Sequence, residues 1–359
     1  MTTATANQVY KANGSGSGTW GALPGGSNTV AVNSASDFPA AVTGVITLAD
    51  NTVYVISGTI SISDTLTPGT GSSIVSLESH SNELIYTGTG SMFKGVNKSL
   101  HVTGLSVRCA TGTLLDFTDT APLKDSVIEF VNVEFTQTKH VGLCTDIKQL
   151  RYFACVYDDI ITTGHTFAGD IEQVFAGASD FVMNAASPVF DLGSATFDLM
   201  WSTDFQVKLL NAGATFVTGL ASGANINVSG TGQLVNGLYL GTGSALSGVT
   251  ADDLLWFFHN NSTIANTAPD AVIYMVNNAT ETVISTQNVP VPVLGTFSEH
   301  RASHFSTTAA GRITYLGMQD HRTTISASLS AKTASGADKD ITVYVALNGS
   351  IIANSAISN

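Results

Sequence analysis

The sequence predicts an all-β protein whose main part is a right-handed parallel β-helix, a solenoid of stacked coils. A short apolar motif returns at intervals of roughly two dozen residues, as in repeat proteins. Its copies are Met92–Phe93, Leu114–Phe117, Val189–Leu192 and Thr215–Thr218. The segments between them alternate apolar and polar residues without a helical period. Because one coil cannot bury its inward row alone, the copies are expected to stack and to pair their edges.

Longer strands with strict alternation are expected between these copies: Leu100–Val107, Ser126–Phe135 and Phe197–Phe205. In the second of these strands, Ile128, Phe130, Val133 and Phe135 recur every second or third residue, which predicts one buried face. Aligning the copies requires insertions at 119–124 and 139–149. The alternative fold is an ordinary β-sandwich, whose short strands also lie between turn signals.

The composition limits the classes of partner. Charged residues make up 11% of the 359 residues, against about a quarter in typical soluble proteins, so Ser, Thr, Asn and Gly must supply the polar surface. The net charge of -13 at pH 7 argues against nucleic acid as a partner, because phosphate binding requires a basic stripe. No apolar run approaches the roughly 18 residues that span a bilayer. No membrane span is therefore expected.

Residues 1–40 are expected to form an N-terminal segment before the solenoid. The Gly/Ser run at Gly14–Trp20 is flexible by default and has little with which to build a core. Between Gly14 and Val32 the sequence resembles the N-terminal attachment segments of bacteriophage fibres, in which a Gly-rich run leads into a Trp-Gly pair. The resemblance implies that this segment binds a structural protein of the phage tail or capsid. A disordered leader with an incidental Trp20 is the alternative.

Residues 41–250 are expected to form the shaft. Its first coils are indicated by Val53, Val55, Ile60 and Ile62, which alternate with polar residues. Residues 251–292 are expected to form a neck that begins with a short helix or a tightly buried turn at 251–259. A strand is expected at 271–276, and two prolines stiffen the segment after it.

Residues 293–359 are expected to form a second domain. Asn348-Gly349, between two apolar runs, is the strongest hairpin signal in the chain. Arg312–Tyr315 and Tyr344–Asn354 resemble the C-terminal jelly-roll domains, of the C1q and tumour-necrosis-factor type, that end many phage and large-virus fibre proteins. The segment holds about five or six expected strands where a jelly roll has eight. The domain is therefore predicted to be truncated, or to be a smaller variant.

The resemblances imply a bacteriophage fibre or tailspike, a viral protein of the extracellular virion that is assembled in the host cytoplasm. The expected function is structural and adhesive, with the N-terminus anchored to the virion and attachment to a host surface glycan or receptor. One alternative is a tailspike depolymerase that cleaves capsule or lipopolysaccharide, and another is a head (capsid) fibre or decoration protein. A shaft without a dense acidic groove favours adhesion. The lack of a leader typical of secreted proteins fits release by lysis.

A homotrimer is expected, because such fibres and jelly rolls are commonly trimeric. Closed symmetry would also cover apolar side chains that a single solenoid leaves outside. The candidates for this outward set are Phe130, Phe153, Phe181, Trp201 and Phe205.

Carboxylate pairs are the candidates for glycan hydrolysis, which requires two carboxyl groups about 5 Å or about 6.5–9.5 Å apart. The pairs are Asp158 with Asp159, Asp191 with Asp198, and Asp252 with Asp253. Neighbours on an extended strand point to opposite faces, so the first pair is interpreted as a turn or cap. The second pair is interpreted as turn formers at coil corners, and the third as a helix cap.

Other chemistry is weakly indicated. A lyase would require a basic residue beside a dense acidic cluster, and the mid-shaft bases lack one: Lys139, Lys148, Arg151 and Lys208. The spacing of His300 and His304 would place both on one helix face, but the polar sequence around them predicts a loop. Three cysteines in apolar contexts are expected to be buried free thiols. The sequence assigns no catalytic, cofactor-binding or metal-binding residue.

Overall fold

The computed structural model describes residues 8–12, 18–22, 28–78, 80–120, 124–220, 224–249, 255–264, 267, 270–316, 324–326, 328, 341–352 and 355–358. Strands dominate, and the helical turn η1 (Ala35–Asp37) is three residues long. None of the helices in this part of the chain has the length and apolar character needed to cross a membrane. The chain divides into two units, Met1–Met318 and Gln319–Asn359.

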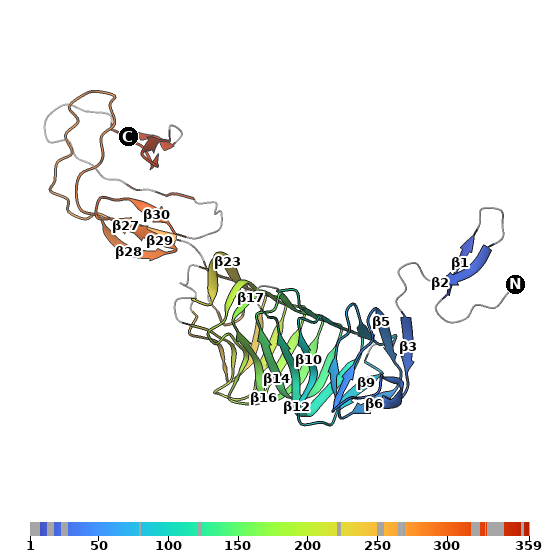
Figure 1. The fold of residues 1–359 in the computed structure, drawn as a ribbon. Coiled ribbons are helices and arrows are strands. Elements are labelled where there is room, and N and C mark those ends of the chain that lie inside the picture. The colour runs from blue at the N-terminus through green and yellow to red at the C-terminus, as the bar shows by residue number, and fades with distance from the viewer. Residues whose placement is uncertain are drawn as a thin grey trace. The chain divides into compact units, whose positions relative to one another are not determined.

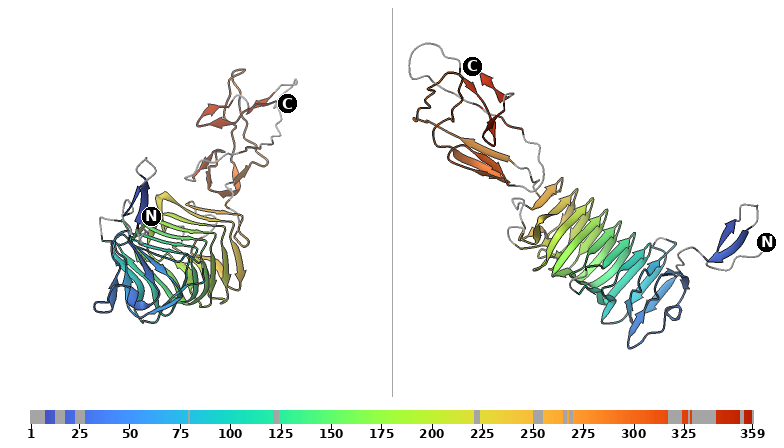
Figure 2. Two further views of the ribbon diagram at one scale, coloured as in Figure 1. Left: turned by 90° about the vertical axis from the view of Figure 1, so that its right-hand side faces the viewer. Right: turned by 45° about the horizontal axis from the view of Figure 1, so that its top comes forward.

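Most of the first unit is a parallel β-helix, which confirms the predicted solenoid (Figures 1 and 2). Each coil contributes one strand to a ten-stranded parallel sheet, here called sheet 1. Its strands are β3 (Asn28–Val32), β5 (Thr52–Ile56), β8 (Ser73–Val75), β11 (Leu100–Thr103), β13 (Val127–Val131), β15 (Gln149–Phe153), β17 (Asp170–Gly177), β20 (Thr196–Thr203), β23 (Ile226–Val235) and β26 (Trp256–His259).

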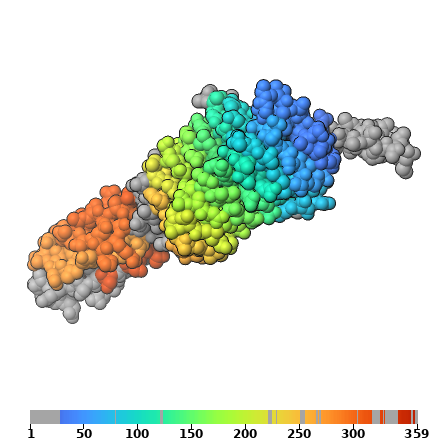
Figure 3. All heavy atoms as spheres, turned by 90° about the horizontal axis from the view of Figure 1, so that it is seen from below, coloured from blue at the N-terminus to red at the C-terminus, as the bar shows by residue number. Residues whose placement is uncertain are grey.

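The rest of each coil forms a second sheet of fourteen strands, here called sheet 2. In the middle coils one long strand bends to cover this side, whereas the outer coils use two short strands. The strands are β4 (Val45–Thr47), β6 (Thr59–Ile62), β7 (Thr65–Thr67), β9 (Glu83–Tyr86), β10 (Ser91–Val96), β12 (Ser106–Thr118), β14 (Glu134–Thr145), β16 (Val156–Ala168), β18 (Asp180–Met183), β19 (Pro188–Asp191), β21 (Gln206–Leu209), β22 (Thr215–Thr218), β24 (Leu238–Gly241) and β25 (Ser244–Ser247). In the space-filling view, successive coils follow one another as bands of colour (Figure 3).

The repeated apolar motif occupies one position in successive coils, as predicted. Phe93 pairs with Leu115, and Phe190 pairs with Val217, both in parallel register. The supposed insertion at 139–149 is wrong, because Lys139–Thr145 continues β14 and stacks on the second halves of β12 and β16. Val141 and Cys144 are therefore part of a further copy, which its small and polar residues concealed.

Two of the predicted long strands, Leu100–Val107 and Ser126–Phe135, are in fact each two strands that meet at a corner, and the third, Phe197–Phe205, is β20 followed by a corner. Gly104, Asn132 and Asp204 hold the left-handed backbone conformation there, with φ of 73°, 54° and 52°. The same corner recurs at Ala154, Ala178, Asn236 and Asn260. Corner N–H groups donate to a carbonyl in the next coil, for example Asn132 N to Phe153 O at 2.9 Å and Ala178 N to Thr203 O at 3.0 Å. The hydrogen-bond ladder therefore continues through the bend.

The core is a stack of side chains from successive coils. Phe135 stacks on Tyr157 with ring centroids 4.1 Å apart, and Tyr157 stacks on Phe181 at 5.5 Å. Ile128, Phe130, Val133 and Phe135 are all fully buried, as the alternation predicted. Stacked aromatic pairs add about 0.5–1.5 kcal/mol each beyond the burial of their surface. The interior aromatics thus bind each coil to the next.

The first coils lie where the sequence predicted them, in β5 and β6, although the inward residues of β5 are Tyr54 and Ile56, and Val53 and Val55 face outward. The expectation at the other end of the solenoid is wrong. The segment expected as a helix or turn contains β26, whose Trp256 and Phe258 are buried and pair with β23. Aspartates 252 and 253, its expected cap, lie outside the described residues.

The remaining strands pair locally and antiparallel. Near the N-terminus, β1 (Gln8–Ala12) pairs with β2 (Gly18–Ala22). After the solenoid, the pairs are β27 (Asp270–Tyr274) with β28 (Ser298–Ser303), and β29 (Phe305–Thr307) with β30 (Ile313–Tyr315).

The second unit contains two further antiparallel pairs. They are β31 (Thr342–Val343) with β34 (Ile357–Ser358), and β32 (Ala346–Leu347) with β33 (Ser350–Ile351). The hairpin at Asn348-Gly349 is confirmed, because both residues have positive φ, 50° and 81°, as a tight turn between β32 and β33 requires. The jelly roll stays a prediction.

Candidate functional site

The outer face of sheet 1 carries a column of side chains in which each coil places one residue directly above the last. We call this column the outer strip. It consists of His101, Glu129, Arg151, Phe175, Trp201, Gln233 and Phe257. Adjacent strands of a sheet lie about 4.8 Å apart, so the strip is a continuous surface parallel to the solenoid axis.

Charges occupy one end of the strip and neutralise each other. Glu129 lies between His101, whose Nδ1 is 3.2 Å from one carboxylate oxygen, and Arg151, whose Nη1 is 2.9 Å from the other. Arg151 also packs against the Phe175 ring, with Cζ 5.6 Å from the ring centroid. An ion pair this exposed contributes at most about 1 kcal/mol to stability. Its main effect is to hold the guanidinium beside the aromatic ring.

Two aromatic rings form the middle of the strip. Phe175 and Trp201 have centroids 5.1 Å apart and planes at 74°. A Cβ at Gly177 would lie only 2.5 Å from the tip of the Phe175 ring, so the ring covers the space that the missing side chain leaves. The two half-buried rings therefore meet edge to face on the outer side of the sheet.

Amides and a further ring flank these aromatics. Gln149 donates from Nε2 to Oε1 of Gln173 at 2.8 Å, in the column on one side of the strip. On the other side Phe153, paired with Gly177, is 43% exposed. Exposed aromatic faces next to amides provide stacking surfaces and hydrogen-bonding groups without net charge. Such a surface can bind a ligand that has both apolar faces and hydroxyl groups.

A second cluster lies on the outer face of sheet 2. The carboxyl groups of Glu134 and Asp158, from adjacent coils, share a hydrogen bond. Burial and then the negative charge of Asp158 raise the pKa of Glu134, while His80 and a hydrogen bond to Ser106 oppose this shift. His80 reaches this region through Nε2, which is 3.2 Å from the carbonyl oxygen of Asn132. A carboxyl group with a raised pKa is a possible proton donor.

The predicted pair Asp158 and Asp159 does not point to opposite faces of the sheet, as neighbours on a regular strand would. Both lie within β16 at a register irregularity between Tyr157 and Ile160, which are both buried. The irregularity places two residues between consecutive inward side chains, so both aspartates face outward. The interpretation as a turn or cap is therefore wrong. Asp159 accepts a hydrogen bond from Asn184, and the carboxyl partner of Asp158 is Glu134.

The structure separates the other predicted pair. Asp191 is on β19 in sheet 2 and accepts a hydrogen bond from the backbone N–H of Gly193 at 3.1 Å, as a turn former does. Asp198 is on β20 in sheet 1 and accepts one from Asn227 Nδ2 at 2.6 Å. The two carboxylates lie on different sheets. The corner interpretation holds for Asp191, whereas Asp198 lies within a strand.

The histidines and cysteines are also accounted for. His300 is exposed in β28, and His304 follows that strand with φ of 58°, so the two do not share a helix face. Of the residues that the structure describes, no group of His, Cys, Asp or Glu could hold a metal ion. The buried free thiols are confirmed: Cys109, Cys144 and Cys155.

A chain of polar groups crosses the core but is sealed from solvent. The Tyr157 hydroxyl donates to the Tyr152 hydroxyl at 3.1 Å, and the Tyr152 oxygen is 2.9 Å from His165 Nε2. Burial lowers the pKa of His165 to about 3, so its imidazole is neutral and its Nε2 accepts a hydrogen bond from the Tyr152 hydroxyl. Phe190 stacks on His165 at 5.3 Å. No ligand can reach these groups without opening the solenoid.

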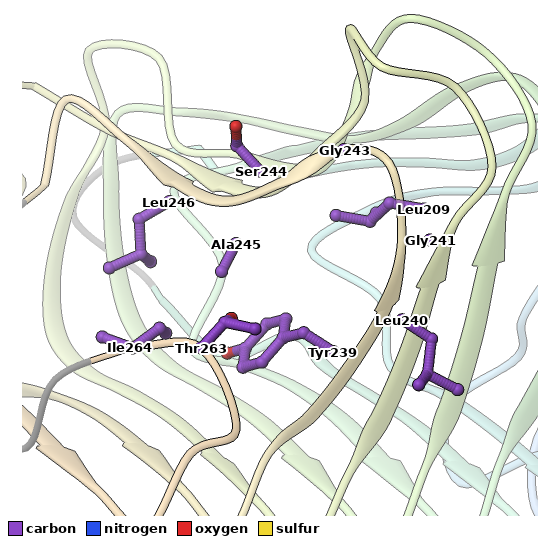
Figure 4. A pocket seen from close by; sticks show the side chains of 10 residues that line it. All are labelled: Leu209, Tyr239, Leu240, Gly241, Gly243, Ser244, Ala245, Leu246, Thr263 and Ile264. Atoms are coloured by element: carbon purple, nitrogen blue, oxygen red, sulfur yellow. The ribbon is translucent and has the colours of Figure 1, made fainter.

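A cavity of about 470 Å³ lies near β24 and β25, at the last coils (Figure 4). Its lining contains no charged side chain, and Leu209, Tyr239, Ser244 and Ile264 lie around it.

Of the five aromatics that were candidates for the outward set, three are inside. Phe130, Phe181 and Phe205 are buried, whereas Phe153 is exposed and Trp201 is half-buried. The outer strip was not predicted, because its members become neighbours only when the coil register is known. Arg151 had been considered only as a catalytic base. One feature of the sequence could have indicated the strip. Phe175 and Trp201 directly follow the inward residues Val174 and Met200, so their rings must point outward.

The fold and the outer strip define an all-β parallel solenoid with an aromatic, charge-neutral external face. Comparison with protein-family models, curated proteins and solved structures found no match.

Proposed function

We propose that this chain is a structural and adhesive bacteriophage fibre protein, anchored to the virion by residues 1–40 and attaching to a glycan on the host surface. The sequence resemblances near both termini and the hydroxyl-rich composition, in which only 11% of residues are charged, support this proposal. In it the solenoid is the shaft and residues 293–359 form the jelly roll. A head fibre is the alternative form of this proposal. In it residues 1–40 bind a capsid protein instead of a tail protein.

The observation that carries adhesion is the outer strip. Large apolar groups exposed together on a protein surface mark interaction sites. Here Phe175 and Trp201 are half-buried on a rigid sheet, so each ring is already ordered and holding it for a ligand costs little entropy. Exposed rings of this kind suit the apolar faces of sugar rings.

A homotrimer is part of the proposal. It would cover outward apolar side chains on sheet 2, such as Leu143 and Ile161, which are 37% and 39% exposed. Light scattering during size exclusion would then give three times the chain mass. A monomer at micromolar concentration would contradict this part alone.

Adhesion is tested with the purified full chain on immobilised bacterial capsule and lipopolysaccharide preparations. We expect binding to at least one preparation, without release of reducing ends or unsaturated sugars over hours. Trp201→Ala should weaken this binding, whereas Leu77→Ala, at an apolar residue that is 84% exposed and lies outside both sheets, should not. Equal binding by both variants and the parent chain would contradict a role for the outer strip.

Glycan cleavage is the second candidate function, and the Glu134–Asp158 pair is the observation that favours it. Hydrogen-bonded carboxyl groups are closer than the about 5 Å separation of a retaining pair, so substrate would have to part them. If the same incubations release sugars, Glu134→Gln and Asp158→Asn should each abolish release, while Asp191→Asn should not. Such a result would replace adhesion with depolymerisation.

A further inference from the structure

We infer that the outer strip selects neutral polysaccharides over acidic ones, and that Glu129 determines this preference by occupying Arg151. This inference rests on the proposed function and specifies its ligand. It assigns separate roles to the two parts of the strip: the rings provide affinity, and the ion pair excludes anionic sugars.

The charge distribution is the first step. Arg151 is the one permanent cation within the strip, and its Nη1 is 2.9 Å from Glu129. The other carboxylate oxygen of Glu129 is 3.2 Å from His101 Nδ1. A sugar carboxylate would have to displace Glu129 to reach the guanidinium. The chain as a whole carries a net charge of -13, which adds long-range repulsion of a polyanion.

The aromatic geometry is the second step. The Phe175 ring is held in place by Arg151 on one side and by Trp201 on the other, at 5.6 Å and 5.1 Å. Its position over Gly177 makes it a floor on which a flat sugar ring could lie. Trp201 then contacts the edge of the same sugar or the face of the next. Stacking of this kind does not require a charged ligand.

The amides complete the site. Gln149 and Gln173 lie beside the strip and hydrogen-bond to each other, which leaves further amide donors and acceptors for ligand hydroxyls. Gln233 lies within the strip, in register with Trp201 on one side and Phe257 on the other. The hydroxyl groups of a neutral sugar can form hydrogen bonds with these uncharged amides. A sugar carboxylate would lose its hydrating water on binding and would find no free cation to pair with.

The experiment measures dissociation constants of the full chain for two neutral polysaccharides, dextran and yeast mannan, and two acidic ones, alginate and hyaluronate. We expect the dissociation constant for a neutral polymer to be at least about tenfold lower than for either acidic one. A tenfold ratio corresponds to about 1.4 kcal/mol of binding free energy. Added salt should narrow the gap, because it screens repulsion.

Three variants test the assigned roles. Trp201→Ala should weaken neutral binding about tenfold. Gly177→Ala should weaken it too, because the added methyl displaces the Phe175 ring without removing an aromatic group. Glu129→Gln should strengthen acidic binding and so narrow the difference between acidic and neutral polymers, since it frees Arg151. Circular dichroism of each variant checks that the fold is intact.

The outcomes separate the two proposals. Preference for alginate or hyaluronate, lost in Trp201→Ala, would overturn the inference but leave adhesion through the strip. Acidic binding that is unchanged in Glu129→Gln would overturn the role of the ion pair. Failure to bind any of these polymers and any capsule or lipopolysaccharide would overturn adhesion itself.

Discussion

The two faces of sheet 1 carry similar aromatic residues in opposite environments. In β15, Tyr152 is fully buried while its neighbour Phe153 is exposed, and in β17 the outward Phe175 lies beside the buried Val174. Inside, each ring stacks on rings from adjacent coils and has no contact with solvent. Outside, the rings are held by one or two neighbours and remain open. We conclude that inner rings determine stability and outer rings are available for binding, and four measurements test this division.

The largest effect is expected from Phe135→Ala. This ring stacks on Tyr157 at 4.1 Å and is fully buried, so its removal leaves a cavity and should cost about 3–5 kcal/mol of unfolding free energy. Urea denaturation followed by circular dichroism measures the loss. Phe153→Ala is the matched exposed control and should cost less than about 1 kcal/mol. Equal losses would remove the distinction between the two faces.

The second-largest effect is expected from acid, which should lower the free energy of unfolding through His165. The pKa of His165 is about 3 in the folded chain, against about 6.5 when unfolded. The unfolded state therefore binds more protons between these values, and stability falls as pH drops below 6.5. The loss attributable to this group approaches about 2.7 kcal/mol by pH 4.5. His165→Phe should flatten the pH dependence measured by urea denaturation, and an unchanged slope would contradict this account.

Tyr152→Phe should have an intermediate effect. The change removes the hydroxyl between Tyr157 and His165, and leaves both without that partner in the sealed core. An unsatisfied buried polar group costs about 1–3 kcal/mol. The melting temperature should fall while glycan binding by the folded protein remains unchanged. Lost binding in a folded variant would show that inner and outer faces are coupled.

The smallest expected effect is an increase in the free energy of unfolding. Ala178 holds φ of 49° at its corner, a conformation that costs a non-glycine residue roughly 1 kcal/mol. Ala178→Gly should therefore raise stability by up to about 1 kcal/mol. Ala176→Gly, on the inward side of the same strand, should lower it, because Ala176 is fully buried. Thermal denaturation of the two variants should move in opposite directions.

The solenoid could be predicted because each strand of a stacked coil has its own alternation of inward apolar and outward polar residues. Ile128 and Phe135 alternate with polar residues, and turn residues such as Asn132 interrupt the strands. The corner itself was missed because inward residues continue past it at almost the same spacing. Copies with small or polar residues, such as the one containing Cys144, were also missed.

The outer strip could not be predicted in the same way. Arg151, Phe175 and Trp201 are about two dozen residues apart, and only the coil register makes them neighbours. The Glu134–Asp158 pair required a strand irregularity that alternation alone does not reveal. Positions inside a coil are thus encoded locally, whereas surface sites depend on several coils at once.

The repeated corner also affects how such a protein can change length during evolution. Because Ala154 and Ala178 have the same backbone conformation and equivalent hydrogen bonds, duplicating or deleting the segment between two corners adds or removes one complete coil. The solenoid would lengthen or shorten by about 4.8 Å while the strands on either side kept their pairing. Reach can therefore change in discrete steps, by gene duplication, without a new fold.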